Sequence, residues 1–124
     1  MSKQVLSIEQ MQHLKELGVD ISKAYMCWVC LNSAPYLSFY SKKYPHEDTK
    51  VISAFTLQDI LDLLPATVDD DYRLYIDKGL VLWTVGYVDA VSEEIYDDFR
   101  ERDLIDAAYE MLCWVIDNGY LKVK

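Results

Sequence analysis

The spacing of apolar residues changes repeatedly along this chain, and that change constrains its fold more than any other feature. Some segments repeat an apolar residue every three or four positions, which is typical of one face of a helix. The segments between them are short and rich in aromatic and β-branched residues, which is typical of strands. The helical segments are 7–18, 56–64 and 104–118, and the strand segments are 24–31, 36–40, 72–76 and 80–87.

The strand segments come in two consecutive pairs, and each pair predicts a β-hairpin. Turn residues separate the members of each pair, around Pro35 in the first and at Lys78-Gly79 in the second. A polar loop is expected at 41–50. The segment 93–99 fits a helix or a polar edge strand, and its aromatic content favours the strand. The order α-β-β-α-β-β-(β)-α predicts a single α+β domain, residues 1–124, with an antiparallel sheet of four to five strands packed with three helices.

The ends of the helices are marked by residues that satisfy or block backbone hydrogen bonds. Ser7 and Gln10 fit a capping box, in which each side chain bonds the free N–H group of the other residue. Thr56 and Asp103 stand where the side chain can cap the first turn of the other two helices. The residues expected to end the three helices are Gly18, Pro65 and Gly119.

Composition indicates a folded protein without a membrane span. Apolar residues make up 52% of the chain and charged residues 27%, which is the balance of a globular protein and not of a disordered one. The longest uncharged apolar run, residues 24–31, has strand length, and the first residues lack the apolar core of a signal peptide. We therefore expect a cytoplasmic protein with no membrane partner, whose three cysteines are reduced thiols.

The net charge of −9 belongs to the second half of the chain. Residues 61–124 hold six basic and fifteen acidic side chains, while residues 1–60 hold six of each. Proteins bind nucleic acids largely through Lys and Arg, which displace counterions from phosphates. Direct binding of DNA or RNA is therefore not expected.

The residues able to carry chemistry form no convincing site. Cys27 and Cys30 match the C-x-x-C pattern of redox and zinc sites, but a strand places their side chains on opposite faces, and burial as small apolar residues is the expectation. His13 and His46 lie outside the apolar pattern and are expected in solvent. The sequence thus predicts no catalytic residue, no metal site and no cofactor, although an enzyme without a recognisable motif stays an alternative.

The strand segment 80–87 carries apolar residues on both faces. Leu80 and Leu82 lie on one face, and the other face has Val81, Trp83, Val85 and Tyr87. A single layer of helices covers only one face of a sheet. The second set must then be covered by the last helix or the loop after Tyr40, by a partner, or by a second copy. The candidate interaction surface comprises Trp83, Val85 and Tyr87, with the acidic residues Asp69, Asp70, Asp71, Asp97 and Asp98 in the same half of the chain.

Two helical segments resemble those of a group of small bacterial and phage proteins. The segment Leu104–Leu121 resembles the closing segment of small uncharacterised proteins from gut Bacteroides-type bacteria and their phages, and Phe55–Pro65 is similar to their middle helix. Together these segments cover about a quarter of the chain. The resemblance implies a phage or mobile-element setting, but the group has no assigned activity, and no functional residue is carried over.

Three hypotheses of function follow from these patterns. The leading one is a noncatalytic protein-interaction module that binds a protein partner or forms a homodimer through the candidate surface. The second is an acidic inhibitor that presents carboxylates in place of nucleic-acid phosphates to a basic host protein. The third is a small enzyme without a recognisable motif.

Overall fold

The structure is a computed structural model, and it describes residues 3–30, 35–39 and 50–123. Within these ranges, three helices and seven strands follow one another along the chain. The helices are α1 (Ile8–Glu16), α2 (Leu57–Leu63) and α3 (Leu104–Asp117). The strands are β1 (Met26–Cys30), β2 (Tyr36–Phe39), β3 (Lys50–Ala54), β4 (Thr67–Val68), β5 (Tyr72–Lys78), β6 (Trp83–Asp89) and β7 (Ile95–Glu101).

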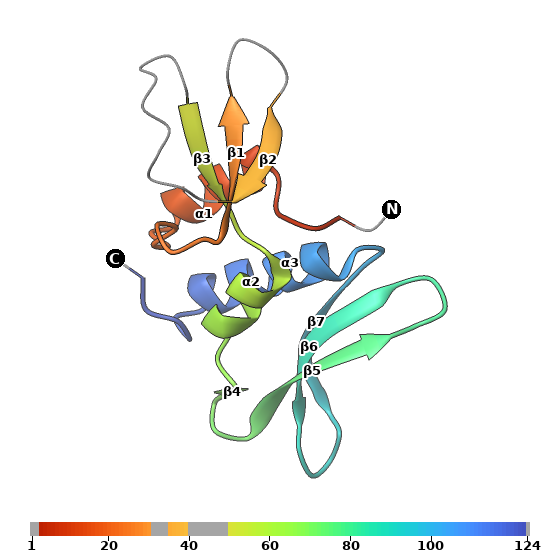
Figure 1. The fold of residues 1–124 in the computed structure, drawn as a ribbon. Helices are drawn as coiled ribbons and strands as arrows, with labels where there is room; N and C mark the ends of the chain where they lie inside the picture. Colours follow the sequence, from red (N-terminus) through yellow and green to blue (C-terminus); the bar gives the residue numbers. More distant parts are fainter. Residues whose placement is uncertain (1–2, 31–34, 40–49, 124) are drawn as a thin grey trace.

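The strands form two antiparallel sheets. One has the order β2-β1-β3 and the other the order β4-β5-β6-β7, and α2 and α3 lie between them (Figure 1). The predicted α+β class, the antiparallel pairing and the order of the elements are confirmed. The strands are divided between two sheets because β3 joins β1, and α2 then carries the chain away to the second sheet.

Two of the strands were not expected from the sequence. β3 pairs with β1 and leads almost directly into α2, so its apolar alternation is too short to stand out. β4 has two residues and pairs only with the start of β5. Both strands depend on partners elsewhere in the chain, which local patterns do not reveal. The predicted polar loop 41–50, apart from Lys50, and the turn residues 32–34 lie outside the described residues.

The capping box that opens α1 is present and also attaches this helix to α3. The Ser7 N–H donates to Gln10 Oε1 at 2.9 Å, and the Gln10 N–H donates to Ser7 Oγ at 3.2 Å. The Gln10 side-chain amide donates to Asp106 Oδ1 at 3.0 Å, and the Lys3 ammonium donates to the same oxygen at 2.8 Å. Gly18 ends the helix with φ at +97°, as predicted.

The remaining helix ends confirm the predictions with one exception. Thr56 caps α2 and forms a capping box with Asp59, and Pro65 follows the end of that helix. Gly119 ends α3 with φ at +78°. Asp103 occupies the N-cap of α3, but its side chain makes no capping bond. Its carboxylate instead accepts a hydrogen bond from the backbone N–H of Lys3 at 3.3 Å, so tertiary contact replaces the local cap.

The hydrophobic core lies between α3 and the four-stranded sheet and extends under α1 and α2. α3 contributes a buried stripe of apolar residues: Ile105, Ala107, Ala108, Met111, Leu112 and Val115. The hydrophobic staple residues Leu6 and Met11 are also completely buried. The core therefore uses the helical stripes that the sequence indicates.

An aromatic cluster closes one end of the four-stranded sheet against α3. The rings of Tyr96 and Trp114 meet edge to face at 5.5 Å between centroids, and Tyr120 stacks on Trp114 at 5.4 Å. Tyr72 packs on Tyr96 at 4.6 Å. The Tyr120 hydroxyl donates to Asp69 Oδ2 at 2.8 Å, which attaches the β4–β5 turn to the end of α3. Part of the high tyrosine content is thus structural.

Candidate interaction surface

Two residues of the predicted interaction surface belong to the core. Val85 and Tyr87 are completely buried on the face of β6 that α3 covers. The Tyr87 hydroxyl donates to the Pro65 carbonyl at 2.7 Å, and burial raises the pKa of this hydroxyl. The prediction that Val85 and Tyr87 face a partner is therefore wrong, because the last helix covers them. Trp83 is half-buried, with the Lys78 ammonium 5.4 Å from its ring centroid.

The opposite face of the four-stranded sheet is polar, as expected for a solvent-facing side of an antiparallel sheet. The Tyr75 ring lies across Gly86, where an added Cβ would stand 2.7 Å from the ring and 2.8 Å from the Asp98 Cβ. The Tyr75 hydroxyl donates to Asp98 Oδ2 at 3.4 Å, and Arg100 forms an ion pair with the same oxygen at 3.4 Å. Burial, followed by the Asp98 charge, raises the pKa of Tyr75.

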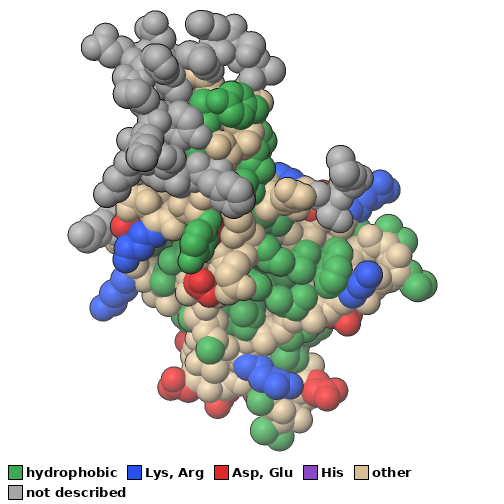
Figure 2. Space-filling view, viewed as in Figure 1, with side chains coloured by type: hydrophobic (Ala, Val, Ile, Leu, Met, Phe, Trp, Pro, Cys, Tyr) green, Lys and Arg blue, Asp and Glu red, His purple; other side chains and the backbone are tan. Residues whose placement is uncertain are grey.

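Of the nine large apolar residues that are exposed in the described part of the chain, four gather at the end of the β5–β6 hairpin. Strand β6 begins at Trp83 and not at the predicted residue 80, because the Gly79 N–H bonds to the Leu82 carbonyl at 2.9 Å and closes a loop. Leu80 is fully exposed, Val81 is 69% exposed and Ile76 is 41% exposed. We call Ile76, Leu80, Val81 and Leu82 the tip surface. Figure 2, which has the same view as Figure 1, shows hydrophobic side chains in the middle of the molecule and at the end of the β5–β6 hairpin.

A shallow concavity borders the tip surface at Leu80, Val81 and Leu82. It has a volume of about 530 Å³ and is lined by the hairpin loop together with polar residues of three strands. Tyr75, Asp77, Thr84 and Arg100 provide its polar groups. The tip therefore combines exposed apolar side chains with hydrogen-bonding groups, which is the usual composition of a protein-binding surface.

The predicted acidic residues do not form one surface. Asp69, Asp70 and Asp71 form the β4–β5 turn, where Asp69 and Asp70 have left-handed backbone conformations. Asp97 and Asp98 follow one another in β7, so their side chains leave opposite faces. Two carboxylates already have partners, because Asp69 accepts the Tyr120 hydroxyl and Asp98 pairs with Arg100.

The cysteines and histidines named in the sequence are not brought together. Cys27 is buried in β1, where burial raises the pKa of its thiol, and Cys30 lies three residues further along the same strand. His13 is exposed on α1, and His46 is outside the described residues. Across residues 3–30, 35–39 and 50–123, the structure contains no group of three or more His, Cys, Asp or Glu side chains able to hold a metal ion.

A groove along α3 holds several titratable side chains. Glu110 is half-buried there, and desolvation, a hydrogen bond to Glu101 and the Glu101 charge raise the pKa of its carboxyl to about 7. The same groove is lined by His13, Tyr109 and Cys113. Burial is the largest cause of the raised pKa of the Cys113 thiol, which disfavours the thiolate that a nucleophile requires.

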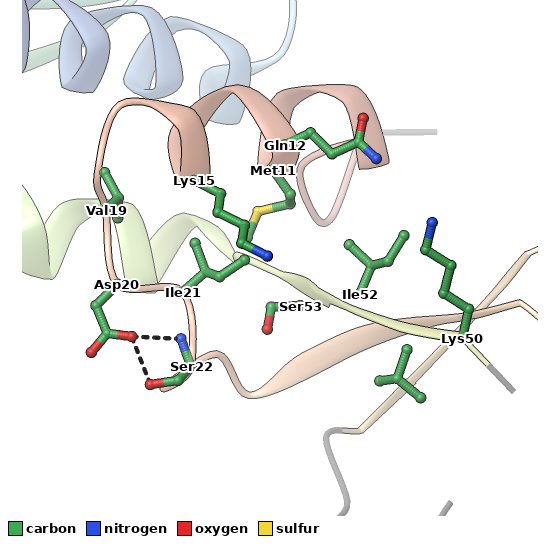
Figure 3. A pocket seen from close by; sticks show the side chains of 11 residues that line it. Met11, Gln12, Lys15, Val19, Asp20, Ile21, Ser22, Lys50, Ile52 and Ser53 are labelled. Carbon is green, nitrogen blue, oxygen red and sulfur yellow. Dashed lines mark hydrogen bonds between the residues drawn. The ribbon is translucent and has the colours of Figure 1, made fainter. Parts of the chain in front are cut away.

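A second concavity of about 530 Å³ lies between α1, the segment 19–22 and β3 (Figure 3). Met11, Val19 and Ile52 form apolar parts of its wall, and Lys15 and Lys50 contribute ammonium groups. Asp20 at its edge accepts hydrogen bonds from the backbone and hydroxyl of Ser22, at 3.0 Å and 2.7 Å. These contacts form a local turn and bring no catalytic pair together.

Sequence reasoning missed the tip surface because the run from Leu80 to Leu82 has the composition of a strand. The turn signal at Gly79 was recognised, but the length of the turn depends on one backbone hydrogen bond. Three consecutive apolar residues directly after a turn glycine are the available signal.

Comparison with known proteins gives this chain no relative. No family model, curated protein or solved structure matches it. Among the described residues, no helix has both the length and the apolar character required to cross a membrane.

Proposed function

We propose that this chain is a noncatalytic module that binds another protein through the tip surface. One observation carries the proposal: three consecutive apolar residues, Leu80 to Leu82, are exposed at the end of a hairpin whose strands are otherwise well ordered by pairing. Hairpin loops normally carry polar residues, Gly or Pro, and a run of exposed apolar residues has no use in the fold itself.

The tip surface makes no contribution to the core that would explain its composition. Ile76, Leu80, Val81 and Leu82 are all absent from the cluster of residues that pack around α3. Covering an exposed side chain of this size contributes about 1.5–3 kcal/mol. A partner that covers two or three of them would gain about 3–9 kcal/mol, which offsets part of the roughly 4–15 kcal/mol that association costs.

The two other hypotheses have less support from the geometry. An acidic inhibitor needs an array of free carboxylates, whereas Asp69 and Asp98 are bound to neighbouring groups of the protein itself. An enzyme needs a base close to a nucleophile or to a second functional group. The α3 groove offers Glu110, whose pKa of about 7 suits a general acid or base, but burial is the largest cause of the raised pKa of the Cys113 thiol, which disfavours the thiolate that a nucleophile requires.

The proposal is tested by comparing the wild type with two variants on an affinity support in extract of the native host. Leu80→Asp/Val81→Asp places charges on the tip, and Val91→Asp is the matched control, since Val91 is 94% exposed in the other hairpin turn of the sheet. Quantitative mass spectrometry should find proteins retained by the wild type and the control but reduced at least about tenfold on the tip variant. Equal retention by all three proteins would contradict the proposal.

A further inference from the structure

Among the strands that the structure describes, none lies along one side of the outer half of β5. β5 has seven residues, and all of them pair with β6, whereas β4 pairs only with Tyr72 and Arg73. Beyond the backbone bond from the Leu74 N–H to the Ala66 carbonyl at 2.9 Å, no described strand lies along the other edge of β5. The segment from Tyr75 to Lys78 is therefore an open sheet edge. Figure 1 shows this part of the hairpin projecting away from the helices.

The register of the sheet identifies which backbone groups are open. Backbone N–H and C=O groups of consecutive strand residues point to alternate edges. Leu74 donates toward β4, while Gly79 and Asp71 bond across to the β6 side, to Leu82 and Ala90. The backbone groups of the odd-numbered residues of β5 thus hydrogen-bond to β6, and the N–H and C=O groups of Ile76 and Lys78 point to the open edge.

The gap is a consequence of the preceding helix. α2 ends at Leu63, and only three residues separate it from β4. The chain reaches the sheet only at Ala66, so β4 cannot extend along the outer half of β5.

The other edge of this sheet carries a net negative charge that the open part of β5 lacks. Four of the seven residues of β7 are charged: Asp97, Asp98, Arg100 and Glu101. Charged side chains on an edge strand discourage another strand from pairing there. The open part of β5 carries one acidic and one basic residue, Asp77 and Lys78, after Tyr75 and Ile76, and it leads directly into the apolar loop of the tip.

We infer that the protein partner binds by adding an extended segment as a strand along β5, where it hydrogen-bonds Ile76 and Lys78. This inference rests on the proposed function and names the form of its partner. An extended chain is the occupant that satisfies a row of open N–H and C=O groups. It also lies beside the tip surface, so its apolar side chains cover Ile76 and the adjoining loop.

The side chains around the edge define the composition of the added strand. Side chains on one face of it meet Ile76 and Lys78, and those on the other face meet Tyr75 and Asp77, because strand residues alternate between faces. Asp77 forms no ion pair with any residue that the structure describes. The matching segment therefore places an apolar residue opposite Ile76 and a Lys or Arg next to Asp77.

A second copy of this chain matches the edge less well. Antiparallel pairing of two β5 edges centred on Asp77 places two Asp77 carboxylates opposite each other, which is destabilising. Pairing centred on Ile76 avoids that contact, so the charge of the whole chain is what disfavours a second copy. Each copy also carries a net charge of −9. A basic segment of another protein has the complementary charge.

Selection from a displayed library of random peptides tests the inference. The wild type should enrich peptides in which apolar residues alternate with Lys or Arg. Ile76→Pro removes the N–H at the open edge and leaves the hydrogen bonds to β6 intact, since proline is tolerated on the solvent side of an edge strand. Ile76→Val is the matched control because it keeps both the N–H and an apolar side chain.

Strand addition predicts that Ile76→Pro weakens the enriched peptides at least about tenfold, while Ile76→Val retains binding within about twofold. Circular dichroism should show that both variants are folded. Peptides that lose binding with Leu80→Asp/Val81→Asp but keep it with Ile76→Pro would overturn strand addition and leave the proposed function standing. Peptides insensitive to both changes, or a library that yields no binder, would overturn both. A β5-mediated dimer of the wild type, abolished by Ile76→Pro, would also contradict the heterologous partner.

Discussion

The two halves of the β5–β6 hairpin have similar apolar content but different surroundings. In the half next to β4, Leu74 pairs with the buried Tyr87, and α3 covers the pair. In the outer half, Ile76 pairs with Val85, and the exposed fraction changes across a single cross-strand pair, from 0% at Val85 to 41% at Ile76. Coverage by α3 ends at that pair.

This difference separates residues that stabilise the fold from residues that are free to bind. Apolar side chains in the covered half are required by the core, so their replacement must lower the free energy of unfolding. The apolar side chains of the tip surface contact solvent, so their replacement should change binding and leave stability almost intact. The following changes are ordered from the largest expected effect to the smallest.

Tyr87→Ala should lower the free energy of unfolding by about 3–5 kcal/mol, because it removes a buried ring and leaves the Pro65 carbonyl without its hydroxyl donor. Urea denaturation followed by circular dichroism measures the change. Tyr87→Phe keeps the ring and should cost only about 1 kcal/mol. If Tyr87→Ala were as stable as Tyr87→Phe, the covered half would not be the core of the sheet.

Gly86→Ala should lower the free energy of unfolding by about 1–3 kcal/mol, because the new methyl group would overlap the Tyr75 ring and the Asp98 Cβ. Thr84→Ala, on the same face and strand, is the control and should have a smaller effect. Thermal unfolding of the two variants side by side decides the question. A neutral Gly86→Ala would show that Tyr75 does not lie across the strand.

The stability of the protein should depend on pH through Glu110, which forms a hydrogen bond with Glu101 at the end of β7. The pKa of Glu110 is raised from 4.5 to about 7, with burial as the largest cause, so the folded protein retains a proton that the unfolded chain releases. Its contribution to stability is therefore greatest below about pH 4.5 and is lost as the pH rises toward about 7.

Glu110→Gln should accordingly raise the melting temperature at about pH 8 and leave it nearly unchanged at about pH 4. Melting temperatures measured across this range test the sign. Glu93→Gln, at an exposed position in a turn, is the control and should show no such trend. A Glu110→Gln variant destabilised at the higher pH would contradict the assigned direction.

Leu80→Asp/Val81→Asp should change the free energy of unfolding by less than about 0.5 kcal/mol, since neither side chain packs in the core. Denaturant titration against the wild type provides the measurement. A loss comparable with that of Tyr87→Ala would mean that the outer half is a structural element and not a binding surface.

Features that depend on neighbouring residues could be predicted from the sequence. The Ser7–Gln10 capping box, the stop at Pro65 and the apolar stripe of α3 are local, and the structure has all three. The aromatic content of residues 93–99 favoured a strand over a helix, and the structure has a strand at Ile95–Glu101. Composition also indicated the surplus of apolar residues in the second hairpin.

Features that depend on distant partners could not be predicted. The burial of Val85 and Tyr87 requires knowing that α3 crosses β6, and β3 and β4 exist only through pairing with β1 and β5. The open edge of β5 depends on how soon the chain reaches the sheet after α2. The sequence placed the candidate surface on the second hairpin, but two of its three apolar residues, Val85 and Tyr87, are buried under α3.

Hydrogen exchange at individual amides of β5 tests the central claim most directly. In the free protein, the amides of Tyr75 and Asp77, which bond to β6, should exchange slowly, and those of Ile76 and Lys78 should exchange quickly. Addition of a peptide selected for binding should slow exchange at Ile76 and Lys78 at least about tenfold. Unchanged fast exchange at both amides in the saturated complex would contradict strand addition at this edge.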